Sequence, residues 1–377
     1  MNPRLDLLAP SLIRAIHAQR RPGDIDLSLG EPVLRPDPEP FEAAMRRVRE
    51  EGTPYTPNAG LASLRSAIAR HDGIADGSPE HVCITVGSEE ALYLALKTLI
   101  DPAHDEVLVV EPCYLAYPKL CHLEGIDVRA VALSPDDDFA PRAEALLEAL
   151  GPRTRALILN SPCNPTGRVW PAAELRALAA GLANRTDPVW VIMDEVYREL
   201  YYGAHAPASL ARLHPHTVTI GSLSKSNALT GMRVGWMIAD PAVVTQAVKV
   251  HGLVNTAAPT FSQWVAEAIF DTPEGLTVHR QAYAERRRQL LELADANGLE
   301  LIPPEGAFYA FLRLPERLAA DSLSAAARLL DDRRVLAVPG IAFGAAGEGW
   351  LRISWVAAAE DLREGLERMA GLLTEHS

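Results

Sequence analysis

The segment Ser222-Leu-Ser-Lys-Ser-Asn-Ala-Leu-Thr-Gly-Met-Arg-Val-Gly-Trp236 gathers an amine, the hydroxyls of Ser222 and Ser224 and a guanidinium within its first twelve residues. Apolar runs stand on both sides, at residues 217–220 and 233–238. Each run is short and apolar, which predicts two buried strands. We therefore expect the polar cluster at a strand end that faces a cleft. A polar turn with a surface lysine is the simpler alternative.

Lys225 is one of only four lysines in the 377 residues. A lysine amine forms Schiff bases with aldehydes, and pyridoxal phosphate is the aldehyde cofactor that needs one. The hydroxyls of Ser222 and Ser224 and the planar fork of Arg233 are donors that a phosphate dianion requires. The segment therefore indicates a cofactor lysine next to a phosphate site.

Composition limits the class of protein. A chain with 48% hydrophobic and 23% charged residues is typical of a soluble globular enzyme, and its length allows two domains. The net charge of −13 argues against nucleic acid or an anionic membrane as a partner. The first residues lack the basic-then-apolar order of a secretory signal, and no apolar run is long enough to span a membrane. The four cysteines show neither metal spacing nor disulfide density, so we expect a cytoplasmic protein without a metal.

Between about residues 80 and 240, apolar strand-like runs alternate with helical stretches. Such runs are typical of strands buried on both faces of a mostly parallel α/β sheet. After a long helix-like segment at 276–297 the rhythm changes, with strand candidates at 307–312, 335–338 and 350–355. This change predicts a separate, smaller α+β domain. We expect residues 40–260 to form the large domain, and residues 1–39 with 261–377 the small one.

In an open α/β sheet, ligands bind at the carboxyl ends of the strands. After the first strand-like run come Gly87, Ser88 and Glu89 at the start of a helix, where backbone amides can hold phosphate. An ordinary N-cap serine is the alternative. Tyr114 follows the next run, where its ring can stack on a planar cofactor or fill the core.

Two further strand ends carry side chains that suit the same cofactor. Asn164 can donate to a phenolate oxygen or close an Asx-type turn. Asp194 can pair with a protonated pyridine nitrogen or cap a loop, and Tyr197 lies three residues further on. Together with Lys225, these strand ends provide a phosphate cradle, a stacking ring, a phenolate donor, a pyridinium partner and an imine lysine.

In this order the motifs resemble the class I and II pyridoxal-phosphate aminotransferases, which are fold-type-I enzymes. The resemblance is strongest to the branch with kynurenine, alanine and bacterial aspartate aminotransferases, and it runs from about residue 25 to 356. It rests on Gly30-Glu-Pro32, Tyr55 with Gly60 and Leu64-Arg65, Gly87-Ser-Glu-Glu-Ala-Leu92, Asn164-Pro-Thr-Gly167, Asp194-Glu-Val-Tyr197, Ser222-Leu-Ser-Lys225 through Arg233, and Leu351-Arg-Ile-Ser354. It implies a large domain with a mostly parallel seven-stranded sheet flanked by helices, plus a smaller α+β domain.

The resemblance implies amino-group transfer from an L-α-amino acid to a 2-oxo acid through a Schiff base between Lys225 and pyridoxal 5'-phosphate. Lys225 would also move the proton between the substrate Cα and the cofactor. Asp194 would keep the pyridine nitrogen protonated. Asn164 and Tyr197 would hydrogen-bond the phenolate oxygen of the ring, with Asn164 also next to the substrate.

The same resemblance assigns the remaining contacts. The cofactor phosphate would be held by the turn at Gly87, Ser88 and Glu89, together with Ser222, Ser224 and Arg233. Tyr114 would stack on the ring, and Tyr55 would reach the phosphate from the neighbouring subunit, which implies a homodimer with shared active sites. Arg352 would bind the substrate α-carboxylate, helped by the backbone of Gly30.

Arg352 also stands out without the resemblance. It interrupts the apolar pattern Trp350-Leu-Arg-Ile-Ser-Trp355, and a buried charge is costly unless an anion pairs with it. An edge-strand arginine that faces water is the alternative.

Two positions depart from the family pattern. Asn227 replaces a residue that is usually aromatic or bulky, and Glu89 stands where some aspartate-using relatives carry a lysine for the distal carboxylate. We therefore expect a donor whose side chain is neutral or cationic. A lyase or cyclase, such as a cysteine-conjugate β-lyase, would keep every site residue named above. A non-catalytic ligand sensor fused to a DNA-binding domain is the remote alternative. We expect it to be remote because the chain begins almost at the start of the fold and leaves no room for such a domain.

Overall fold

A seven-stranded sheet forms the larger part of the protein in the computed structural model, which describes residues 12–272 and 274–374. The strand order is β2-β8-β7-β6-β5-β3-β4, and β8 runs antiparallel to both of its neighbours while the other pairs are parallel. The strands are β2 (Val82–Thr85), β3 (Glu106–Glu111), β4 (Asp127–Ala132), β5 (Thr154–Asn160), β6 (Trp190–Asp194), β7 (Thr217–Ser222) and β8 (Gly235–Ile238). The predicted α/β sheet is confirmed.

Helices cover both faces of this sheet. Val107 and Val109 of β3 join a core with α4, α5 and α9, whereas Leu108 joins a core with α6 and α7. Successive strand residues point to opposite faces, so a continuous apolar run buries both of them. At the β2–β8 end, α10 packs against α2 and α3. These helices are α2 (Glu39–Glu51), α3 (Ala62–His71), α4 (Ser88–Leu99), α5 (Ala116–Glu124), α6 (Ala143–Ala149), α7 (Ala172–Ala183), α8 (Leu223–Ser226), α9 (Pro241–Val254) and α10 (Thr260–Phe270).

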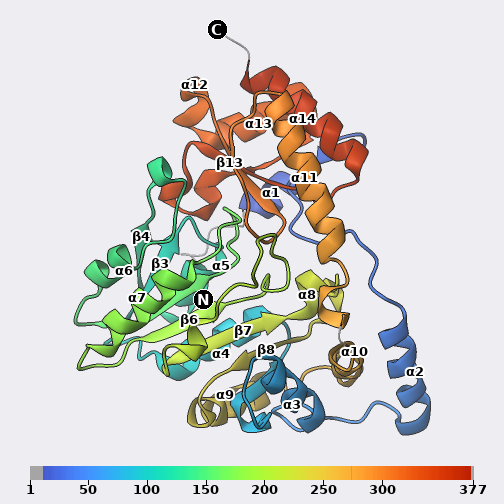
Figure 1. The fold of residues 1–377 in the computed structure, drawn as a ribbon, viewed down its shortest axis with the longest axis vertical. Helices are drawn as coiled ribbons and strands as arrows, with labels where there is room; N and C mark the ends of the chain where they lie inside the picture. Colours follow the sequence, from blue (N-terminus) through green and yellow to red (C-terminus); the bar gives the residue numbers. More distant parts are fainter. Residues whose placement is uncertain (1–11, 273, 375–377) are drawn as a thin grey trace, which may run out of the picture.

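The C-terminal third builds a second, antiparallel sheet of order β12-β13-β10-β9, seen with its helices in orange and red in Figure 1. Next to it, β1 pairs in parallel with β11 and so joins the N-terminal segment to this part. The elements are α1 (Leu12–His17), β1 (Ile25–Asp26), α11 (Arg280–Ala296), β9 (Leu301–Ile302), β10 (Tyr309–Arg313), α12 (Glu316–Ala319), α13 (Ser322–Arg333), β11 (Val335–Leu336), β12 (Val338–Pro339), β13 (Trp350–Ser354) and α14 (Ala359–Leu373). The smaller α+β part is thus confirmed.

Two predicted elements differ in detail. The run at 335–338 is not one strand, because β11 pairs with β1 and β12 pairs with β13 in a different sheet. The helix expected from residue 276 begins at Arg280, after a separate 3₁₀ turn at Gly275–Thr277. The domain boundaries expected at residues 39/40 and 260/261 stay a prediction. Residues 1–11 of the expected small domain lie outside the part that the structure describes.

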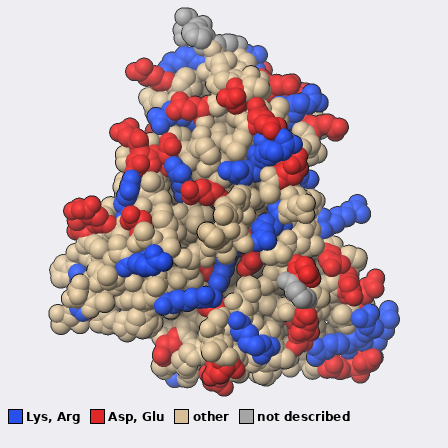
Figure 2. All heavy atoms as spheres, in the orientation of Figure 1, with Lys and Arg blue, Asp and Glu red and all other residues tan. Residues whose placement is uncertain are grey.

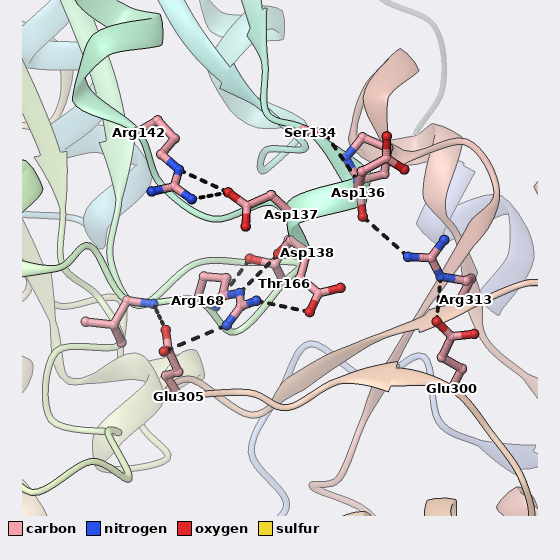
Figure 3. A network of polar contacts seen from close by, with 12 residues as sticks. Ser134, Asp136, Asp137, Asp138, Arg142, Thr166, Arg168, Glu300, Glu305 and Arg313 are labelled. Atoms are coloured by element: carbon pink, nitrogen blue, oxygen red, sulfur yellow. Dashed lines mark hydrogen bonds and ion pairs between the residues drawn. The ribbon is translucent and has the colours of Figure 1, made fainter.

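A polar network joins the two parts at the loop after β5 (Figure 3). Arg168 Nε donates to the Asp138 carbonyl at 3.0 Å, and the guanidinium lies 3.8 Å from the Glu305 carboxylate. Gly167 has a φ of +70°, and a Cβ there would lie 2.5 Å from Pro304. Only glycine therefore lets this loop approach the second sheet so closely.

Charged side chains are spread over the surface of the protein. On the face drawn in Figure 2, acidic and basic side chains intermingle without a continuous basic track. Within residues 12–272 and 274–374, no helix is long and apolar enough to cross a membrane.

Glu195 follows the last residue of β6 and is buried. It lines a small cavity of about 30 Å³ with Thr219 and Trp236. Burial raises the pKa of Glu195 to about 7, because the loss of hydration outweighs the attraction of Arg198, whose Nη1 lies 3.2 Å from the carboxylate.

This carboxyl group links stability to pH. The folded protein binds its proton more tightly than the unfolded chain, whose pKa stays near 4.5, so the stabilisation is complete below 4.5 and lost as the pH rises to about 7. We expect Glu195→Gln to match wild type at pH 4.5 and to be more stable by about 1–3 kcal/mol at pH 8. Urea unfolding of both proteins at the two pH values tests this. An equal difference at both pH values would contradict it.

Candidate active site

A cavity of about 450 Å³ opens at the carboxyl ends of β5 and β6. Eleven of the site residues expected from the sequence line it: Gly30, Ser88, Glu89, Tyr114, Asn164, Asp194, Tyr197, Ser224, Lys225, Arg233 and Arg352. Gly87 lies next to the Arg233 side chain, and Ser222 is hydrogen-bonded to Ser224, so both contact residues that line the cavity. Tyr55 lies elsewhere, on the surface, with 87% of its area exposed.

Lys225 is positioned by a single turn of helix. Ser222 ends β7 and caps α8, since its Oγ accepts from the amide of Ser224 at 3.0 Å. The same Oγ lies 2.8 Å from the Val234 carbonyl and fastens the turn to the strand that follows. Lys225 Nζ donates to the carbonyl of Gly30 at 2.7 Å, so the amine is directed into the cavity from one side and Gly30 borders it from the other.

Asp194 is a buried carboxylate at the end of β6. Tyr117 Oη donates to its Oδ2 at 2.7 Å, and the amide of Val196 donates to Oδ1 at 3.2 Å. Loss of hydration raises the pKa of Asp194 to about 6, although the two hydrogen bonds and the charge of Lys225 lower it. Ionised at neutral pH yet poorly solvated, this carboxylate favours a cationic partner in the cavity.

Arg352 lies on β13 and is 2% exposed. Its Nη2 donates to the carbonyl of Ser28 at 2.7 Å, and its Nη1 donates to Asn164 Oδ1 at 3.1 Å. Its Nε has no hydrogen-bond partner among residues 12–272 and 274–374. Burial lowers the pKa of Arg352, and no carboxylate of the described residues lies at ion-pair distance from it. The guanidinium therefore retains donors for a bound anion.

Two aromatic rings flank that guanidinium. Its carbon lies 4.3 Å from the ring centroid of Tyr309 and 5.1 Å from that of Phe343. Tyr197 Oη donates to Tyr309 Oη at 3.2 Å. Burial raises the pKa of Tyr197 well above its usual range, so the phenol keeps its proton and can act as a donor at neutral pH.

The start of α4 and Arg233 form a compact cradle. Gly87 has a φ of +80°, and a Cβ on it would lie 2.5 Å from Arg233 Nη2. A Cβ on Gly235 would lie 2.6 Å from the amide nitrogen of Ser88. Gly87 thus lets the guanidinium, and Gly235 lets the backbone of β8, approach the first turn of a twelve-residue helix, whose free amides attract anions.

Three residues of this arrangement were not singled out from the sequence. Tyr117 holds Asp194, Ser28 holds Arg352, and Tyr309 contacts both Arg352 and Tyr197. Tyr117 had a detectable signal, because it lies only three residues after Tyr114, and the two ring centroids are 5.7 Å apart. Ser28 and Tyr309 had none in the local pattern.

The donors present fit pyridoxal phosphate. The cavity offers a primary amine for an aldehyde, a buried carboxylate for a ring nitrogen, a cationic cradle for a phosphate, and a buried guanidinium with a free donor for a carboxylate. Among the described residues no group of His, Cys, Asp and Glu side chains is arranged to hold a metal ion.

Known proteins are similar to this chain in sequence and fold over most or all of their length. The family described as aminotransferase class I and II matches residues 22–369. An aspartate/prephenate aminotransferase of Thermus thermophilus is 36% identical, over 99% of this chain and 98% of its own. An arginine–pyruvate transaminase of Pseudomonas aeruginosa is 36% identical, over 91% of this chain and 88% of its own. The solved structure of the Thermus thermophilus aspartate aminotransferase with maleate has a TM-score of 0.92 and 34% identity, and the alignment covers 99% of both chains. The chain belongs to the class I and II aminotransferase family.

Proposed function

We propose that this aminotransferase moves an amino group from an L-α-amino acid to a 2-oxo acid with pyridoxal phosphate held on Lys225. The observation that carries the proposal is the meeting of three groups in one cavity: the Lys225 amine, the buried Asp194 carboxylate and the buried Arg352 guanidinium. An aldehyde, a pyridinium nitrogen and an α-carboxylate each need one of these partners.

When bound, pyridoxal phosphate supplies an aldehyde that condenses with amines and a ring that accepts electrons from the substrate Cα. Asp194 holds a proton on the ring nitrogen, because a neighbouring cation is what stabilises this poorly solvated carboxylate. Arg352 binds the α-carboxylate through its free donors and so fixes the orientation of Cα. Lys225 then moves the proton at Cα as a general base and acid.

The remaining side chains hold the cofactor ring and its phosphate. Because Asn164 Oδ1 accepts from Arg352, its Nδ2 is left to donate to the ring oxygen, together with Tyr197. Tyr114 stacks on the ring. The phosphate ligands that we propose are Ser88, Ser224 and Arg233, supported by Gly87, Glu89 and Ser222.

Glu89 bears on the choice of amino donor. It is exposed and lines the cavity at the first turn of α4, where its charge repels a second carboxylate on the substrate. Its charge also raises the pKa of Tyr114, after the larger effect of burial, so the carboxylate acts on the interior of the site. Arg14 and Lys119 line the same cavity and would attract such a carboxylate, so the donor test must separate their effect from that of Glu89. We propose a donor with a neutral or cationic side chain.

A homodimer with shared sites explains the exposure of Tyr55. The segment that carries it is fastened to the loop before α10, since Asn58 Nδ2 donates to Thr256 O and Thr260 Oγ1 donates to Pro54 O, both at 2.6 Å. Next to this loop, Leu253 is 90% exposed at the end of α9. Large apolar side chains exposed together are typical of an interface. We propose that Tyr55 reaches the phosphate site of a second copy.

We place the protein in the cytoplasm. Its four cysteines are free, and Cys83, Cys113 and Cys121 are buried. Reduced thiols of this kind are typical of a reducing compartment.

The first prediction concerns Lys225. Wild type with pyridoxal phosphate should show a visible absorbance band that depends on Lys225 and is absent in Lys225→Ala. A suitable L-amino acid should convert that band to the spectrum of pyridoxamine phosphate, and one equivalent of 2-oxo acid should form. Release of 2-oxo acid with ammonia, while the band persists, would instead identify a lyase. A wild type without any Lys225-dependent band would overturn the proposed function.

The second prediction concerns donor choice. Glu89→Lys should raise kcat/KM for aspartate relative to alanine by about tenfold, because the new cation attracts the distal carboxylate. Glu89→Gln, which removes the charge alone, is the matched control and should give a smaller rise. A wild-type preference for aspartate that disappears in Lys119→Met would contradict the proposal.

The third prediction tests the shared site. Tyr55→Ala and Lys225→Ala should each lower activity on their own. Refolding an equal mixture of the two should restore roughly a quarter of wild-type activity, since half of the dimers are mixed and each of those has one intact site. A mixture no more active than the sum of its parts would show that Tyr55 serves its own subunit.

A further inference from the structure

Tyr309 is a phenol in the cavity wall to which the roles above give no task. It is 1% exposed and begins β10, where it pairs with Ser354 of β13. Arg352 lies two residues before Ser354, so its side chain leaves the sheet on the same face as that of Tyr309. This register explains why the guanidinium carbon lies only 4.3 Å from the centroid of the tyrosine ring.

The hydroxyl of Tyr309 contacts the other half of the site. It accepts a hydrogen bond from Tyr197 Oη at 3.2 Å. A Cβ on Gly30 would lie 3.2 Å from the same hydroxyl, so the backbone that accepts from Lys225 passes close to it. One side chain therefore contacts the arginine proposed for the substrate carboxylate and the phenol proposed for the ring oxygen.

We propose that Tyr309 is a positioning residue that acts through both neighbours: its ring supports Arg352, and its hydroxyl donates to Tyr197 while Tyr197 donates to the cofactor. The inference rests on the proposed function of the site. A phenol has one proton and can still accept, so once the proton of Tyr197 points to the ring oxygen, its own oxygen is free to accept from Tyr309. Hydrogen bonds in such a chain polarise and strengthen one another.

The hydroxyl is tested by Tyr309→Phe, which keeps the ring. In the protein loaded with pyridoxal phosphate, the visible absorbance changes with pH as the nitrogen of Lys225 loses its proton. Without Tyr309 Oη, Tyr197 donates a weaker hydrogen bond to the ring oxygen of the cofactor. The ring oxygen then becomes more basic, and the nitrogen of Lys225 keeps its proton to a higher pH. We expect the midpoint of the titration to rise by about half a pH unit.

The matched control is Tyr283→Phe. Tyr283 is fully buried in the same core as Tyr309, and its hydroxyl has no hydrogen-bond partner among the described residues. The midpoint of the absorbance titration of Tyr283→Phe should equal that of wild type. A Tyr309→Phe midpoint equal to wild type would overturn the role of the hydroxyl, whereas loss of the wild-type band itself would overturn the proposed function instead.

The ring is tested by Tyr309→Leu, with propionate as a carboxylate probe that carries no amine. Its dissociation constant is measured from the absorbance of the loaded protein. Removal of the aromatic face should weaken propionate binding about 3- to 30-fold, while Tyr309→Phe should stay within about twofold of wild type. Equal affinities in wild type and Tyr309→Leu would overturn the role of the ring. Thermal melts show whether Tyr309→Leu folds. If it does not, the titration of Tyr309→Phe decides whether the proposal holds.

Discussion

The burial of Arg352 is the constraint on which the geometry of the site depends. A guanidinium that is 2% exposed has lost most of its hydration, and that loss is costly unless neighbouring groups replace it. The replacement comes from three distant segments: the Ser28 carbonyl, the Asn164 amide and the Tyr309 ring. Each of them is neutral, so the charge is solvated without being cancelled. This arrangement gives a cation that is fixed in position and still able to bind an anion.

Asp194 is a second buried charge that lines the same cavity as Arg352. Tyr117 and the amide of Val196 donate to it, yet burial still raises its pKa to about 6. Its donors are neutral, just as the acceptors around Arg352 are. The two buried charges are therefore each hydrogen-bonded, and neither forms an ion pair with another of the described residues. A ligand with a cationic nitrogen at one end and a carboxylate at the other would complement both.

Much of the site could be predicted from sequence, because parallel strands bring their carboxyl ends to one edge. Asn164, Asp194 and Lys225 each follow a recognisable apolar run, and the α/β topology was sufficient to bring them together. The contacts of Tyr309 could not be predicted in the same way. Its hydroxyl meets Tyr197 across 112 residues of sequence, and its position above Arg352 depends on the register of β10 against β13. A shift of that register by one residue would turn the ring to the opposite face, and local periodicity does not specify register.

The junction between the two parts explains how Arg352 and Asn164 meet. Arg352 belongs to the second sheet and Asn164 to the loop after β5, so their bond crosses the junction. Gly167 ends the same loop, and its carbonyl accepts from the amides of Glu305 and Gly306 at 2.8 and 2.9 Å. Arg168 adds its contacts to Asp138 and Glu305. All of these contacts lie within the chain and hold the loop against the second sheet. The position of the Arg352 guanidinium against Asn164 is therefore a property of the folded chain, and the cost of ordering the two side chains is met on folding.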